Sequence, residues 1–248
     1  MSVDFSFGVG LLLALLRSAG LVVAVPVLGE SAVPIRTRVA AALVLGTAAF
    51  FAAGSPAPEM PVTDAGLVAA AAGESLLGLS VGLSCRIVLL AATGAGALAG
   101  MSMGLGFGLV ADPLTGVAQP TVARLLTFLA VIAAAGLGLH RQAVLWLASG
   151  LRQIPPGHFV SAADLARGVV VEAIRSVGLA VRIAFPVVGA VTFGHVVLGL
   201  LGRTAPSLNL VSIGFSIAIV AGGFALYLVA PSAATLAARA AAEVLAVR

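Results

Sequence analysis

One serine and one histidine in this chain are candidates for an intramembrane nucleophile and its base. Ser102 lies between Gly100 and Gly104, so residues 100–104 read Gly-x-Ser-x-Gly, and His195 follows much further along. A serine and a histidine on two apolar helices could form a dyad in which the imidazole activates the hydroxyl. The Gly-x-Ser-x-Gly elbow of hydrolases needs a strand–turn–helix context, however, and these residues lie in an apolar helical pattern. A serine protease is therefore the least favoured interpretation.

A second chemical possibility comes from charged residues inside apolar stretches. These residues are Arg17, Glu74, Glu172, Arg175 and Arg182. Each arginine would cost about 2.5–3.5 kcal/mol at the centre of a bilayer, so we expect these side chains to face protein or water. Glu172, Arg175 and Arg182 share one helix face, where Glu172 could pair with Arg175. That face could be an interfacial stripe, an inter-subunit ion pair or the wall of a channel.

Glu74 is the candidate for a proton path, which would indicate a small-solute transporter. One carboxylate supports such a path weakly, and the alternative is a glutamate hydrogen-bonded between neighbouring helices. The single cysteine, Cys85, excludes an internal disulfide and indicates no metal site. The net charge is +4, but the basic residues are dispersed, so the pattern does not indicate nucleic-acid binding. We expect no cofactor and no metal.

A row of glycines is the most distinctive feature of the middle of the chain. Gly96, Gly100, Gly104 and Gly108 recur every four residues, which would place them on one face of a helix. Such a face lets another backbone approach closely, and soluble helices avoid it because each interior glycine costs about 1 kcal/mol relative to alanine. The row predicts a helix that packs closely against another, or one that breaks or bends. Met101 and Met103 could form a deformable apolar seal or ordinary core.

The composition places the chain in the membrane class. It is 61% hydrophobic and 9% charged over 248 residues, whereas soluble domains are about 25% charged. Seven apolar runs cover residues 5–28, 37–53, 66–84, 87–111, 122–139, 169–201 and 208–230. A spanning helix needs about 20 residues, which several of these runs supply. Residues 144–151 are too short to span, and a separate terminal helix is expected from Pro231 onward.

The arginines between the runs suggest an orientation. With the N-terminus outside, most of them fall on the inner side, in agreement with the positive-inside rule. The parity depends on dividing the third and fourth runs at Arg86. No internal repeat is visible, and we expect one integral membrane domain, residues 1–248.

Four segments resemble, in the same order, motifs of the flagellar biosynthetic protein FliR family. They are residues 25–38, 100–113, 140–157 and 195–219, and the second reads GxxMGLxFxxxxDP. Ser207 and Ser216 depart from the family pattern, which has glutamine and proline at these places. The resemblance spans nearly the whole chain.

The resemblance implies an all-α membrane subunit of helical hairpins that assemble into a cone-like export gate. It would be a structural and gating subunit of the flagellar type III protein export channel, and not an enzyme. It would lie in the bacterial inner membrane, in the flagellar basal body. Its partners would be FliP-like and FliQ-like gate subunits, FlhA- and FlhB-like proteins, and unfolded flagellar export substrates.

The resemblance also implies that the segment after the glycine row is a plug closing the channel. The residues of the gate and plug would be Met101, Met103, Phe107, Leu109, Val110, Asp112, Pro113, Leu114 and Gly116. An ordinary surface connection between two helices is the alternative for this segment. The alternatives for the whole chain are an injectisome export gate subunit of the same superfamily, a small-solute transporter, and a rhomboid-like intramembrane serine protease. The Met-Gly-Leu-x-Phe stretch favours the flagellar branch.

Overall fold

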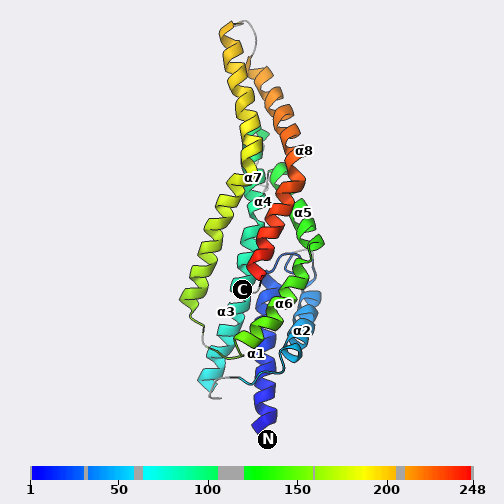
Figure 1. Cartoon of the computed structure of the whole chain (residues 1–248), viewed down its shortest axis with the longest axis vertical. Helices are drawn as coiled ribbons and strands as arrows, with labels where there is room; N and C mark the ends of the chain where they lie inside the picture. Colours follow the sequence, from blue (N-terminus) through cyan, green and yellow to red (C-terminus); the bar gives the residue numbers. More distant parts are fainter. Residues whose placement is uncertain are drawn as a thin grey trace. The chain divides into compact units, whose positions relative to one another are not determined.

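The computed structural model describes residues 2–30, 33–58, 64–105, 120–158, 160–204 and 210–246. The secondary-structure elements of these ranges are α-helices and the described residues include no strand, which confirms the predicted all-α class (Figure 1). The helices are α1 (Ser2–Ala24), α2 (Ile35–Ala52), α3 (Asp64–Leu89), α4 (Ala91–Ser102), α5 (Thr121–Gly136), α6 (Leu139–Gln153), α7 (Ala162–Thr204) and α8 (Leu210–Leu245).

The chain forms two compact units that interleave along the sequence. The first unit comprises Met1–Val88, Ala134–Ile174 and Arg239–Arg248. The second unit comprises Leu89–Ala133 and Arg175–Ala238. The expectation of a single integral domain stays a prediction.

In the first unit, α1 runs antiparallel to α2 and the two helices lie side by side (Figure 1). The Phe7 and Phe50 rings meet edge to face with centroids 5.4 Å apart. Towards the other end of α1, the Ser18 hydroxyl donates a hydrogen bond of 2.8 Å to the Ala42 carbonyl. This bond satisfies a hydroxyl that is fully buried in an apolar contact.

The contact between α1 and α3 in the first unit is closer still, because it is built on glycines. A Cβ added at Gly20 would lie 2.8 Å from the Leu79 nitrogen, and one at Gly78 would lie 2.9 Å from the Leu21 nitrogen. A Cβ at Gly82 would lie 2.9 Å from the Leu21 carbonyl oxygen. Real Cβ atoms do not approach backbone this closely, so only glycine permits the observed packing. The order of the contacts shows that α1 and α3 run parallel.

The loop that joins α1 to α2 is held by arginines from both neighbouring helices. Arg38 of α2 donates to the carbonyls of Val33, at 3.0 Å, and of Glu30, at 2.5 Å. Arg86 of α3 approaches the Glu30 carboxylate at 3.7 Å and donates to the Gly29 carbonyl. These bonds satisfy carbonyl groups that have no helical partner.

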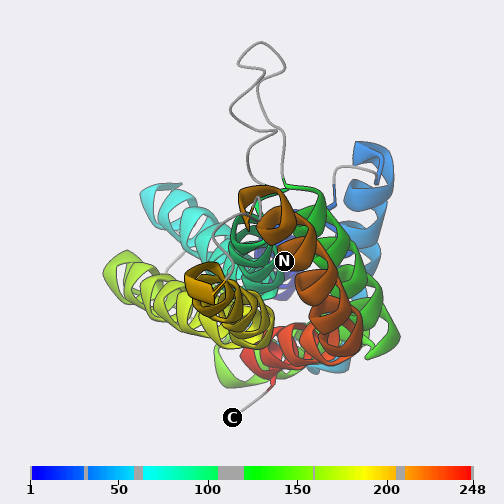
Figure 2. The same cartoon turned by 90° about the horizontal axis from the view of Figure 1, so that it is seen from above.

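The second unit contains two antiparallel helix pairs. In the first pair, α4 meets α5 where the Thr93 and Thr127 hydroxyls share a hydrogen bond of 2.6 Å. In the second pair, α7 and α8 lie side by side in both views (Figures 1 and 2), and a Cβ at Gly194 would lie 3.2 Å from Ile217. A small core of the unit includes Met103, Val122 and Val191.

The described helices include five that are long and apolar enough to cross a membrane, or six if α5 and α6 together make one span. The described helices give five or six candidate spans where seven were predicted, and the predicted division at Arg86 is wrong, because α3 continues through it. Residues Ala65–Ser102 form one candidate span, in which only Leu90 interrupts the helices. Arg86 can lie within this run because its side chain bonds to the loop after α1. The predicted orientation, with the N-terminus outside, depended on that division and no longer follows from the arginine positions.

Two further boundaries differ from the predictions. The run over residues 122–139 ends as a helix at Gly136, and α6 starts at Leu139 after Gly138 takes a φ of +74°, which favours glycine. At the other end of the chain, α8 continues through Pro231. No separate terminal helix begins there, because a proline removes only one hydrogen bond from a long helix.

Candidate functional site

A buried ion pair joins two of the apolar helices of the first unit. Arg17 of α1 and Glu74 of α3 have side chains only 1% and 2% exposed. The Arg17 Nε donates to Glu74 Oε2 at 2.5 Å, and its Nη2 donates to Oε1 at 3.0 Å. This two-bond geometry matches the planar guanidinium to the carboxylate and compensates each charge for the loss of water. Of the two predicted surroundings, protein or water, Arg17 has protein.

The same two side chains also bond to the backbone that follows α6. Arg17 Nη2 donates to the Ile154 carbonyl at 3.0 Å, and the Gly157 amide donates to Glu74 Oε1 at 2.9 Å. The turn Ile154–Gly157 leaves the helix, with Ile154 extended and Gly157 at a φ of +87°. We call Arg17, Glu74 and this turn the buried junction.

The junction distinguishes between the two roles predicted for Glu74, a proton path and a hydrogen-bonded contact between helices. Of the alternatives, a carboxylate hydrogen-bonded between helices is the one that the structure supports, because both of its oxygens accept bonds. Sequence reasoning named Arg17 and Glu74 separately and missed that they pair. The available signal was that opposite charges in two apolar runs each need a partner.

The other three charged residues, Glu172, Arg175 and Arg182, lie on a different helix, α7. Arg175 and Arg182 are exposed, and Glu172 is half-buried. The expectation that these two arginines face protein or water stays a prediction. The predicted pairing of Glu172 with Arg175 stays a prediction.

The glycine row does not form one helix face. α4 ends at Ser102, and Gly104 lies beyond it with a φ of +77°. Gly96 is close-packed, since an added Cβ would lie 2.8 Å from the Ala123 nitrogen of α5. Gly100 has more space, with its nearest neighbours at 3.7 Å. The regular spacing was misleading because a left-handed residue ends the helical register, and Gly108 lies outside the described residues.

The region just after α4 packs against α8 in the second unit. Met103 is buried, and a Cβ added at Gly222 would lie 2.6 Å from its Cγ atom. A Cβ at Gly104 would lie 2.8 Å from the Phe215 ring. Met101 is 57% exposed, so the two methionines have different environments. Met103 belongs to the core, and Met101 is available to contact something outside the chain.

The serine and histidine of the protease hypothesis have ordinary structural surroundings. The Ser102 hydroxyl donates to the Ala99 carbonyl of its own helix at 2.8 Å. His195 is an exposed residue of α7. The serine therefore already uses its proton in a local helical bond, which is common for this residue in apolar helices.

The predicted plug lies outside the described residues. This applies to Phe107, Leu109, Val110, Asp112, Pro113, Leu114 and Gly116. The structure does describe both flanks of this segment. A Cβ at Gly100 would lie 3.7 Å from both Pro120 and Val122, so the end of α4 is adjacent to the start of α5.

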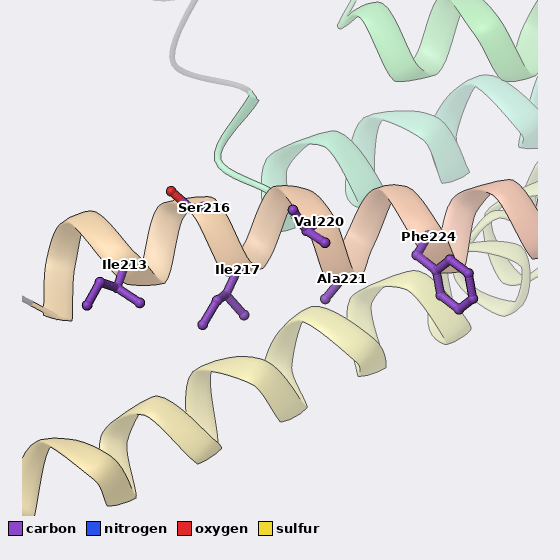
Figure 3. Close-up of a pocket in the computed structure, with 6 residues that line it drawn as sticks. All are labelled: Ile213, Ser216, Ile217, Val220, Ala221 and Phe224. Carbon is purple, nitrogen blue, oxygen red and sulfur yellow. The ribbon is translucent and has the colours of Figure 1, made fainter.

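An apolar groove of about 490 Å³ lies along α8 in the second unit. The residues that line it are Ile213, Ser216, Ile217, Val220, Ala221 and Phe224. Figure 3 shows Ile213, Ile217 and Ala221 pointing from α8 towards the neighbouring α7. Val220 and Phe224 are 71% and 65% exposed. Such a surface suits contact with lipid or with another apolar protein surface.

The fold and the junction define an integral membrane protein of apolar helices, in which charge is buried as a pair. The chain belongs to the bacterial export proteins, family 1, whose family model matches residues 9–244. It is 28% identical over 210 residues to the flagellar biosynthetic protein FliR of Escherichia coli (strain K12), covering 84% of this chain and 79% of that protein.

The FliR of Caulobacter vibrioides is 25% identical over 206 residues, covering 83% of this chain and 82% of the relative. The FliR of Pectobacterium carotovorum subsp. carotovorum is 27% identical over 210 residues, covering 83% of this chain and 78% of the relative. The resemblance predicted from the four motifs is confirmed.

Proposed function

We propose that this chain is a structural subunit of the flagellar type III export gate, in the bacterial inner membrane at the basal body. Membership of the export family and similarity to three FliR proteins support this proposal. The role is not catalytic. Ser102 is engaged within its own helix, and Glu74 is neutralised by Arg17, which disfavours a protease and a proton-coupled transporter.

The observation that carries the proposal is the exposed apolar surface of α7 and α8. Its exposed side chains include Phe185, Phe193, Val220, Phe224 and Tyr227. In a membrane such a surface contacts lipid or another protein, and aromatic side chains are enriched where one protein packs on another. We infer that FliP-like and FliQ-like subunits cover part of it in a cone-like assembly, with FlhA- and FlhB-like proteins adjacent and unfolded flagellar proteins passing through.

The test is co-purification of the tagged full-length chain from its own membranes in mild detergent. We expect FliP-like and FliQ-like proteins to be recovered with it and identified by mass spectrometry. A Phe224→Ser variant should recover less of these partners, whereas Ser232→Ala, an exposed control on the same helix, should not. Recovery of the chain alone, with transport or protease activity, would contradict the proposal. Recovery with injectisome subunits would instead assign the chain to the injectisome export gate.

The gating part of the proposal concerns residues 106–119. The described residues on its two sides are adjacent, since a Cβ at Gly100 would lie 3.7 Å from Pro120 and from Val122. Apolar residues such as Leu109, Val110 and Leu114 could fill a pore, with about 25 cal/mol gained per Å² of apolar surface buried. In the loop predicted over residues 109–119, Asp112-Pro113 at one end and Pro120 at the other restrict the backbone.

Deletion of residues 114–118 tests the plug. We expect the complex to assemble but to conduct ions without substrate, measured as conductance in reconstituted bilayers. Leu114→Ile, which keeps the apolar volume, is the control and should remain closed. A deletion variant that assembles, stays impermeable to ions and supports swimming would show that the segment is only a connection between helices.

A further inference from the structure

The buried junction does more than join two helices. Arg17 of α1 and Glu74 of α3 bind each other, and each also binds one end of the turn after α6. The cation holds the carbonyl of Ile154, and the anion holds the amide of Gly157. Two charges of opposite sign thus match a backbone acceptor and a backbone donor.

The contact between α1 and α3 does not need these charges. Gly20, Gly78 and Gly82 already bring the two backbones together along the same faces. A buried ion pair is often no more stabilising than apolar side chains of similar volume, because both ions lose their water. The stability of the helix pair alone therefore gives no reason for Arg17 and Glu74.

The turn gives that reason. Gly157 is buried, and its amide lies outside any helix, so it needs an acceptor from a side chain. Apolar residues at positions 17 and 74 could fill the space but could not bond to Ile154 or Gly157. The turn lies a few residues before α7, which begins at Ala162.

We propose that Arg17 and Glu74 are positioning residues that hold the turn Ile154–Gly157 against α1 and α3, and thereby set where α7 begins. The charge pair holds the turn in place, and the glycines permit the close contact between α1 and α3. Hydrogen bonds from the side chains of Arg17 and Glu74 to the turn backbone thus link α1 and α3 to the segment that leads into α7.

The test compares Glu74→Leu, Arg17→Met and the double variant in the full-length protein purified in detergent. Each single variant leaves one buried charge without its partner and should unfold at a clearly lower temperature. The double variant should recover most of that loss. Its Gly157 amide, however, should exchange hydrogen for deuterium about tenfold to a hundredfold faster than in the unmodified chain, since a bond to a charged acceptor is lost.

Two controls separate the turn from general loosening. Ser18→Ala removes a buried bond from α1 to α2 and should leave exchange at Gly157 unchanged. Glu74→Gln keeps an acceptor oxygen and should give exchange between that of the unmodified chain and that of the double variant. A double variant whose Gly157 amide is as protected as in the unmodified chain would overturn the proposal. A double variant as unstable as the single variants would also overturn it, because the pair would then serve the helix contact.

Discussion

Replacing Gly78 by alanine should separate α1 from α3, although the change adds a single methyl group. The added Cβ would overlap the Arg17 carbonyl oxygen and would lie 2.9 Å from the Leu21 nitrogen. Both neighbours are backbone atoms of a helix, so neither can rotate away as a side chain could. The helices must move apart, and this movement also stretches the bonds between Arg17 and Glu74.

Gly73 provides a matched control on the same helix, because a Cβ there has nothing within 4 Å. Both substitutions gain the same helix propensity, about 1 kcal/mol, so this gain cancels in the comparison. The remaining difference is the overpacking cost, typically about 1–3 kcal/mol. We expect the upper part of that range, since the overlap is with backbone.

Thermal unfolding of the two purified variants measures the difference directly. For a chain of this size, 1 kcal/mol shifts the Tm by about 2–4 °C, so a cost of about 2–3 kcal/mol should make Gly78→Ala unfold about 4–12 °C below Gly73→Ala. Swimming of cells that carry each variant gives a second readout. Equal unfolding temperatures would refute the reasoning, because they would mean that α1 and α3 are not in backbone contact at Gly78.

Three other substitutions test separate parts of the structure. Gly104→Ala should lower the free energy of unfolding, measured by thermal unfolding, by about 1–3 kcal/mol, because Gly104 has a φ of +77° and faces the Phe215 ring. If Gly104 were instead an ordinary residue inside a helix, the same substitution would raise the free energy of unfolding. The buried Arg17 Nη1 lacks a hydrogen-bond partner among the described residues, and it would lie 3.9 Å from a Cβ added at Gly150. A serine hydroxyl at position 150 could accept a bond from it, so Gly150→Ser should be more stable than Gly150→Ala by about 0.5–1.5 kcal/mol. Equal stability of the two variants would exclude that bond. Ser102→Ala should change stability by less than about 0.5 kcal/mol and leave swimming intact; loss of export with normal complex assembly would revive a catalytic role.

The chain's class was predictable because hydropathy is a local property. Apolar runs of spanning length identify membrane helices whatever their neighbours are, and five candidate spans are found where such runs occur. The family was predictable because four short motifs keep their order. Helix ends were harder, since α8 passes through Pro231 and the α4 helix stops before Gly104. Proline and glycine bias the backbone, but packing decides whether a helix continues.

The partners within the candidate site could not be predicted. The regular glycine row contributes one close backbone contact, at Gly96, whereas the contact between α1 and α3 uses Gly20, Gly78 and Gly82, of which only the last two have the Gly-x-x-x-Gly spacing. Spacing shows which glycines share a helix face but not whether another backbone lies there.

By itself, the sequence determined that this is a helical membrane protein and that charges at positions 17 and 74 need compensation, because burial in apolar surroundings costs free energy wherever it occurs. Only the tertiary structure decided that these charges, 57 residues apart, meet each other and hold the turn after α6. A hydrogen bond requires an approach within about 3 Å, and the folding of α1, α3 and α6 against one another brings these groups that close.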